Sequence, residues 1–116
     1  MKMRFSRDSI LAVLLLTVLT FSFTARADDA PEQQLVLKNH VFVPQELTVP
    51  ANQKVKLIVK NEDDSAAEFE SYELNREKVV PAQGQITVYL DPLDPGTYPF
   101  FDDFHRDTTT GKIIAK

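Results

Sequence analysis

The sequence predicts an all-β protein, specifically a Greek-key β-sandwich, preceded by an export signal. Short runs of alternating apolar and polar residues recur from residue 34 to residue 115, and clusters of Pro, Gly, Asn and Asp separate them. Beyond the first 27 residues, no stretch carries a long apolar period of 3.6 residues, so the pattern gives no core of helices. About seven short strands in a domain of this size are typical of sandwiches with Greek-key connections.

The first 27 residues have the three parts of a Sec-type signal peptide. A basic start is followed by an apolar run from Ile10 to Phe23 and then by the small-residue pattern Ala25-Arg26-Ala27. The apolar run is shorter than the roughly 20 residues that a membrane-spanning helix needs, although an uncleaved anchor is the alternative. We therefore expect cleavage after residue 27, a periplasmic location, and one domain over residues 28–116.

Charge and composition exclude several classes of function. The full chain has a net charge of −4, and removing residues 1–27 leaves nine basic and sixteen acidic side chains, a net charge near −7. This balance argues against a nucleic-acid partner and is compatible with attracting cations. The chain has no cysteine, which excludes disulfides, thiolate metal sites and CxxC redox sites. It also lacks a G-x-S-x-G nucleophile motif and a glycine-rich phosphate loop.

The expected strands follow in order along the domain. Leu35 and Leu37 share one side of the first, and the alternation is clearest in Lys54-Val-Lys-Leu-Ile-Val-Lys60. Turn-forming residues separate the runs, as in Pro81-Ala-Gln-Gly84. The sequence predicts strands at residues 34–37, 47–49, 54–60, 85–90, 97–101 and 112–115. Residues 72–78 are the one segment that fits a helical turn or two, because Leu74 and Lys78 lie four apart and the charged residues are pairable at helical spacing.

Two parts of the domain resemble cupredoxins. Phe42-Val-Pro44, followed by Leu47-Thr-Val-Pro-Ala-Asn52, is similar to the opening strands of that family. Pro95-Gly-Thr-Tyr-Pro-Phe-Phe101, followed by His105 and Gly111-Lys-Ile-Ile114, resembles the strand and loop that carry the cupredoxin copper ligands. The resemblance implies a cupredoxin-like sandwich over nearly the whole of residues 28–116.

The chain departs from cupredoxins at the copper ligands themselves. Asp102 stands where a blue-copper protein has its cysteine, and residues 108–110 are threonines where the methionine is expected. Glu68 aligns best with the first histidine ligand. Without a thiolate or thioether donor, a type 1 blue-copper centre is excluded.

A more specific resemblance is to the EfeO-type cupredoxin-like group, in particular to the small periplasmic proteins associated with bacterial iron uptake. It rests on Glu68-Phe-Glu-Ser-Tyr-Glu-Leu-Asn-Arg-Glu-Lys-Val79 and on Pro95-Gly-Thr-Tyr-Pro-Phe-Phe-Asp-Asp-Phe-His105. The resemblance implies iron handling, through Fe(II) binding or oxidation or through delivery to an inner-membrane iron permease, with copper as the alternative ion. A ferroxidase-like activity and a purely accessory, binding role both fit it.

Six side chains are candidate metal ligands. Carboxylate and imidazole donors suit iron, manganese, zinc or Cu(II) better than Cu(I). Each candidate also has a simpler interpretation: two glutamates on a solvated strand face, two aspartates in a turn, and surface histidines. The alternatives for the whole chain are a metal-free docking module of a transport system and a periplasmic copper-binding protein. The candidate ligands are Glu68, Glu70, Asp102, Asp103, His105 and His40, and we expect Glu68, His105 and a neighbouring aspartate to meet in one cavity at the end of the sandwich.

Overall fold

The computed structural model describes residues 18–21 and 30–116, and the second range contains nine strands and one short 3-10 helix. Most of the expected signal peptide, residues 1–17 and 22–27, therefore lies outside the described residues. Within the described ranges, no helix is long and apolar enough to span a membrane. The elements are β1 (Glu32–Lys38), β2 (Val41–Val43), β3 (Glu46–Val49), β4 (Val55–Asn61), β5 (Ala67–Ser71), β6 (Arg76–Val80), β7 (Gln85–Leu90), β8 (Gly96–Asp102), the 3-10 helix η2 (Asp103–His105) and β9 (Thr110–Ala115).

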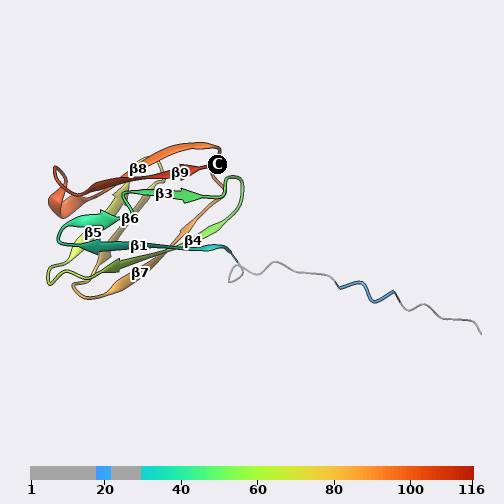
Figure 1. Cartoon of the computed structure of the whole chain (residues 1–116), viewed down its shortest axis with the longest axis horizontal. Coiled ribbons are helices and arrows are strands. Elements are labelled where there is room, and N and C mark those ends of the chain that lie inside the picture. Colours follow the sequence, from blue (N-terminus) through green and yellow to red (C-terminus); the bar gives the residue numbers. More distant parts are fainter. Residues whose placement is uncertain (1–17, 22–29) are drawn as a thin grey trace, which may run out of the picture.

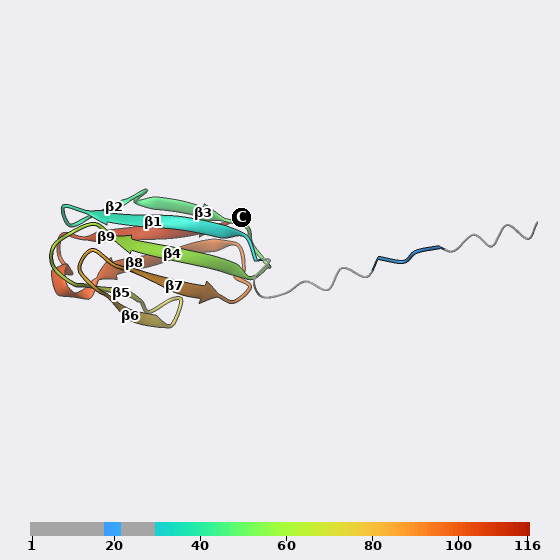
Figure 2. The ribbon, with the colours of Figure 1, turned by 90° about the horizontal axis from the view of Figure 1, so that it is seen from below.

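The strands form two sheets that pack as a sandwich (Figures 1 and 2). One sheet has the order β2-β1-β4-β7 and the other the order β3-β9-β8-β5-β6. The pairs β1–β4 and β3–β9 are parallel, and the other pairs are antiparallel. Consecutive strands β2 and β3 belong to different sheets, so the chain changes layer around Pro44. The predicted all-β sandwich is confirmed.

The core follows from the period-2 alternation of the strands. Leu35 and Leu37 in β1 and Leu57 and Val59 in β4 are at most 1% exposed, because alternate side chains of each strand point into the space between the sheets. Pleated strands with one apolar side become stable only when that side is covered. The two sheets therefore cover each other, and each of the nine strands contributes residues to a single apolar cluster.

Three phenylalanines fill the centre of the cluster. Phe42 meets Phe100 edge to face, with ring centroids 5.0 Å apart, and Phe69 lies 5.3 Å from the same ring. Gly111 provides the room for Phe100, because a Cβ atom there would lie only 2.5 Å from Cζ of that ring. The phenylalanines thus hold β2, β5 and β8 together just below the end of the sandwich discussed next.

The prediction of helical turns at residues 72–78 is wrong. The chain makes a turn after β5 and then enters β6, a strand at the edge of its sheet. Arg76 Nε donates to the carbonyl oxygen of Tyr89 at 3.2 Å and Lys78 Nζ to that of Thr87 at 3.3 Å. The charged spacing that suited a helix instead belongs to an edge strand whose basic side chains reach across to β7 and discourage pairing with other chains.

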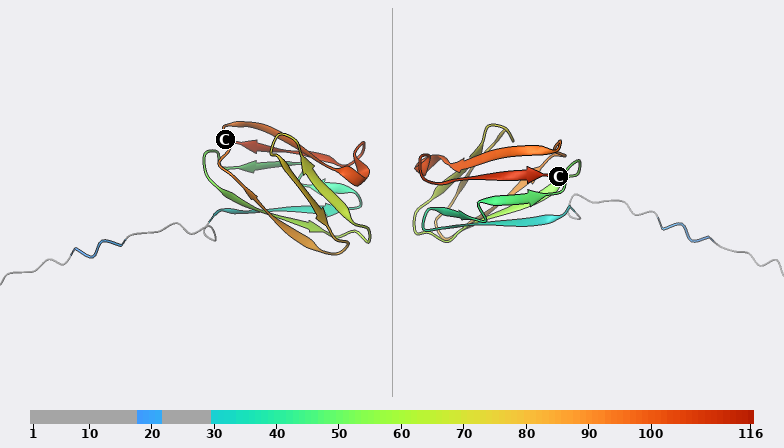
Figure 3. Two further views of the ribbon diagram at one scale, coloured as in Figure 1. Left: turned by 180° about the vertical axis from the view of Figure 1, so that it is seen from behind. Right: turned by 45° about the horizontal axis from the view of Figure 1, so that its top comes forward.

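One end of the sandwich gathers the segments that carry the candidate ligands. The β1–β2 turn, the β4–β5 loop and the segment from β8 through η2 to β9 lie together there, away from the C-terminus (Figure 3). The β5–β8 register places Phe69 opposite Asp102, so these two side chains point the same way, into the sandwich. Glu68 and Glu70 flank Phe69 in β5 and therefore point to the outer face.

Candidate metal centre

The structure divides the six candidate ligands into two clusters. The histidine cluster consists of His40, Asp102 and His105, and the carboxylate cluster consists of Glu68, Glu70 and Asp103; within each, one possible ligand atom per residue lies within 4.8 Å of the others. The sequence suggested one cavity shared by Glu68, His105 and an aspartate. Strand alternation separates them instead, because the glutamates face outward where Asp102 faces inward.

Asp102 is the residue of the histidine cluster whose side chain is held most firmly by hydrogen bonds. Its side chain is fully buried, and Oδ1 accepts hydrogen bonds from the backbone N–H of Glu68 at 2.9 Å and of Phe104 at 3.0 Å. The second of these bonds caps the start of η2. The other oxygen, Oδ2, lies 2.9 Å from Nδ1 of His105. A buried carboxylate needs such partners, and here they hold it in a single orientation.

His105 has its tautomer set by this contact. A carboxylate can only accept, so Nδ1 carries the proton that is shared with Asp102. In the neutral imidazole, Nε2 is then the nitrogen with a free lone pair. The side chain is 35% exposed, so this nitrogen belongs to a ring that solvent and ions can reach. The arrangement is the one in which a carboxylate orients a metal-binding histidine.

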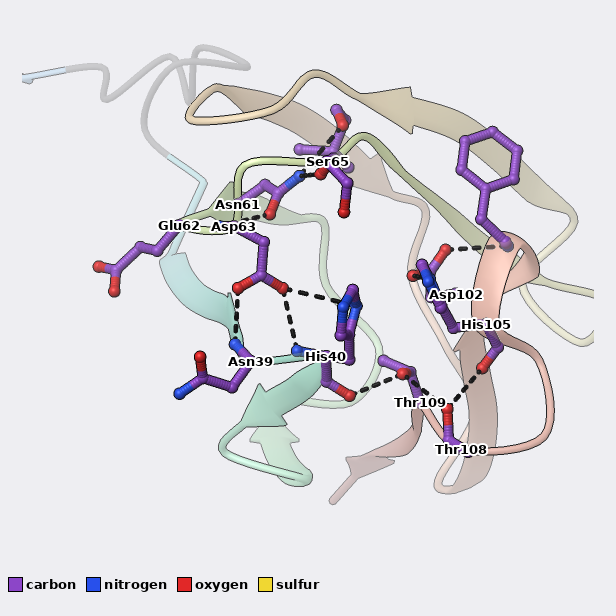
Figure 4. Close-up of polar contacts among 12 residues, drawn as sticks. Asn39, His40, Asn61, Glu62, Asp63, Ser65, Asp102, His105, Thr108 and Thr109 are labelled. Atoms are coloured by element: carbon purple, nitrogen blue, oxygen red, sulfur yellow. Dashed lines mark hydrogen bonds and ion pairs between the residues drawn. The ribbon is translucent and has the colours of Figure 1, made fainter.

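His40 comes from the two-residue turn between β1 and β2. Asn39 and His40 have φ angles of 52° and 57°, as a type I′ hairpin turn requires. Their backbone N–H groups donate to the two carboxylate oxygens of Asp63, at 2.6 and 2.9 Å (Figure 4). Asp63 Oδ2 also lies 3.7 Å from Nδ1 of His40, within range of a charge contact or a bridging water.

The two imidazoles lie against each other. Their centroids are 4.1 Å apart and the ring planes are inclined by 37°. Thr109 ties the two backbones together, because its buried hydroxyl donates to the carbonyl oxygen of His40 at 2.6 Å and its N–H donates to that of His105 at 2.9 Å. Two loops that are distant in sequence are thereby fixed at one place (Figure 4).

Two residues of this arrangement, Asp63 and Thr109, were not expected from the sequence. Asp63 lies outside the strands expected from the sequence, and Thr109 lies in the threonine run noted only for its lack of methionine. The one local signal is Asn61, whose side-chain oxygen accepts from the N–H of Asp63 at 2.9 Å in the manner of an Asx turn. Such a turn predicts a fixed backbone but not its partner across the molecule.

The carboxylate cluster brings together acidic side chains that repel one another. The register places Glu77 of β6 opposite Glu70, on the same outer face. Hydrogen bonding to Glu77, with partial burial and the nearby negative charges, raises the pKa of Glu68 above its usual range. Burial, followed by the charges of Asp103 and Glu77, raises the pKa of Glu70. Arg106, whose Nε donates to Asp103 at 3.1 Å, is the cation that opposes this repulsion.

A hollow of about 510 Å³ lies beside the carboxylate cluster rather than over either cluster. Pro99, Phe101 and Gly111 line it, and Tyr72 and Arg106 lie at its side next to the cluster. None of the six candidate ligands lines it. The candidate ligands therefore lie at the loop end of the sandwich, outside this hollow.

Comparisons with known proteins agree with the fold. The family described as "Cupredoxin-like domain" matches residues 11–115. An uncharacterised protein of Rickettsia prowazekii is 46% identical over 88 residues, which cover 76% of this chain and 70% of that protein.

Solved structures with similar folds include copper proteins. Auracyanin A, a blue copper protein of Chloroflexus aurantiacus, has a TM-score of 0.63 at 15% identity, covering 73% of this chain and 98% of its own. The metal-binding domain of the Cu(I)-exporting P-type ATPase of Streptococcus pneumoniae, solved with Cu(I), has a TM-score of 0.62 at 9% identity, covering 73% and 84%. At these identities the likeness concerns the fold alone.

Proposed function

Because the chain belongs to the cupredoxin-like domain family, we propose that it is an exported protein that binds a metal ion through nitrogen and oxygen donors and handles iron in the periplasm. The observation that carries the proposal is the meeting of all six predicted donors in two clusters at one end of the sandwich, each compact enough for one ion. The signal-like N-terminus and the net negative charge of residues 28–116 support an exported cation-binding role.

The donor set fits a first-row divalent cation. Two imidazoles and four carboxylates, with no sulfur donor in the chain apart from two methionines near its start, are borderline to hard ligands. Iron is the preferred ion because the segments around Glu68 and Asp102 resemble those of iron-uptake proteins. The protein then binds Fe(II) for oxidation, or delivers it to an inner-membrane iron permease as its partner.

Calorimetric titration of the purified protein with Fe(II), Mn(II), Zn(II) and Cu(II), the first under anaerobic conditions, tests the proposal. We expect at least one ion, Fe(II) among them, to bind tightly enough to be carried through purification. If no ion binds with a Kd below about 100 μM, which corresponds to roughly −5.5 kcal/mol, the proposal fails. Oxygen consumption with Fe(II) then distinguishes an oxidase from a carrier.

A second candidate function is copper binding, favoured by the paired imidazoles of His40 and His105. Cu(I) affinity far above Fe(II) affinity would support it. The metal-free docking module is separated from both by Glu68→Ala and His105→Ala, which leave iron uptake unchanged only if the domain acts as a docking surface.

A further inference from the structure

We propose that the histidine cluster holds its ion through two protein atoms only, Nε2 of His40 and Nε2 of His105, and that Asp102 and Asp63 position the rings without binding the ion. This inference rests on the proposed metal-binding function and specifies its site. The ligand it predicts is a small first-row divalent cation that keeps coordination positions open for water or for a donor from another molecule.

The hydrogen bonds of Asp102 argue against its being a ligand. Both of its oxygens are occupied: Oδ1 by the N–H groups of Glu68 and Phe104, and Oδ2 by Nδ1 of His105. Turning the fully buried side chain so that Oδ1 meets an ion would leave the part-buried N–H groups of Glu68 and Phe104 without an acceptor, and an ion on Oδ2 would compete with Nδ1 of His105. Left where it is, Asp102 fixes the His105 tautomer in which Nε2 is the metal-binding nitrogen.

The other half of the cluster repeats this pattern. Asp63 is held by the N–H groups of Asn39 and His40 and lies beside Nδ1 of His40. Each imidazole thus has an aspartate on its Nδ1 side, and each aspartate is anchored by two backbone N–H groups. Each ring therefore faces an aspartate with Nδ1, which leaves Nε2 as the nitrogen that each of the two adjacent rings offers to an ion.

The turn that carries His40 supplies an independent sign that its side chain is selected. The second central position of a type I′ turn favours glycine, since φ is positive there. Histidine tolerates this backbone less well than glycine does, although better than most residues. His40 adopts this unfavourable conformation with its ring against that of His105, as expected if the site needs a second imidazole.

The spacing of the rings suits one ion after a small adjustment. Metal–nitrogen bonds are about 2.0–2.1 Å long, so two imidazoles on neighbouring positions of one ion have centroids roughly 4.5–5.2 Å apart. The present centroid distance is 4.1 Å, and the side chain of His40 is 46% exposed, so it can swing outward. Two protein donors leave at least two positions of a four-coordinate ion open, which suits transfer to a partner better than storage.

Cu(II) is the probe for the test, because it reports its nitrogen ligands directly. One equivalent is added to the purified full chain, and pulsed EPR detects the remote nitrogen of each bound imidazole. We expect two imidazoles in the wild type and in the surface control Glu73→Gln, whose side chain is exposed and belongs to neither cluster. His40→Asn and His105→Asn should each leave one imidazole, with asparagine at position 40 tolerating the positive φ angle.

Asp102→Asn and Asp63→Asn test the positioning role. Each should keep two bound imidazoles while weakening Cu(II) affinity about 10- to 100-fold and shifting the remote-nitrogen quadrupole coupling, which senses the hydrogen bond at Nδ1. The more exposed Asp63→Asn variant serves if Asp102→Asn does not fold.

The failures are distinguishable. Binding of no ion in the calorimetric series overturns the proposed function. Tight Cu(II) binding with fewer than two imidazoles overturns only the two-imidazole site. So does a spectrum that changes when the carboxylate cluster is altered by Glu68→Gln but not in His40→Asn. Unchanged affinity and quadrupole coupling in both aspartate variants overturn the positioning role.

Discussion

His40→Gly should separate the stability of the β1–β2 turn from its role in binding a metal. His40 has a φ angle of 57°, a left-handed conformation that costs a residue with a Cβ about 1–2 kcal/mol and costs glycine almost nothing. Because a single variant also loses the imidazole and its contact with His105, His40→Ala is the matched control: it loses the same ring but keeps the left-handed cost.

The expected difference between the two variants follows from these terms. Glycine gains about 1–2 kcal/mol from relief of the backbone, and loses roughly 0.4–1 kcal/mol because its unfolded chain has more freedom. The balance is about 1 kcal/mol in favour of His40→Gly. For a domain of this size, a difference of about 1 kcal/mol moves Tm by roughly 4–8 °C.

Thermal unfolding of the metal-free variants measures this difference, and calorimetric titration with Cu(II) measures the second property. His40→Gly should melt 4–8 °C above His40→Ala, an order-of-magnitude range, while both lose metal affinity to the same degree. Asn39→Gly, at the neighbouring position with φ of 52°, should gain less because asparagine already tolerates this conformation. Equal melting temperatures for the glycine and alanine variants would refute the account of the turn, and wild-type affinity in either would refute the role of His40.

Three further perturbations follow from the structure. The raised pKa values of Glu68 and Glu70 mean that the folded chain binds protons more tightly than the unfolded chain, so the free energy of unfolding declines as pH rises above the ordinary glutamate range. Glu68→Gln and Glu70→Gln should therefore raise Tm at pH 7 and have little effect at pH 4. An equal gain in Tm at both pH values would contradict this. Thr109→Val leaves the carbonyl oxygen of His40 without its donor and should lower the free energy of unfolding in urea by about 1–3 kcal/mol, together with weaker metal binding. Wild-type stability and affinity would show that this hydrogen bond is unimportant. Gly111→Ala places a Cβ 2.5 Å from Cζ of Phe100 and should lower the free energy of unfolding by about 1–3 kcal/mol through overpacking. Adding Phe100→Leu to the same chain should restore part of this loss. An unchanged free energy of unfolding in the single variant would contradict the packing.

The sequence predicted the sheets well because their pattern is local. In β4, the alternation of lysine with Val55, Leu57 and Val59 reports which side faces the other sheet, and the structure buries these three as expected. Residues 72–78 were assigned wrongly, because charges spaced three and four apart fit a helix and an exposed edge strand equally well. What decided between them was the partner strand β5, which the spacing does not reveal.

The sequence named the six side chains that meet in the two clusters but not how they are grouped, and their binding of a metal stays a prediction. The positions of Asp102 and His105 followed from the loop after β8, whereas the contacts that give them their roles join distant segments. Thr109 reaches His40 across 69 residues, and Asp63 reaches the backbone of Asn39 across 24. Such contacts depend on the strand order of two sheets, and a single sequence contains no local signal for them.

The two clusters differ in a way that suggests how they cooperate. Glu68 and Glu70 repel each other and their acidic neighbours, so this outer face favours an approaching cation and raises its local concentration. In the histidine cluster the one carboxylate, Asp102, is fully buried and hydrogen-bonded, so the cluster offers directed imidazole donors more than long-range attraction. Asp102 also accepts from the backbone N–H of Glu68, which places the attracting and the binding groups on opposite faces of one strand pair. Under the proposed function, the outer face would attract the ion and the histidine cluster would bind it.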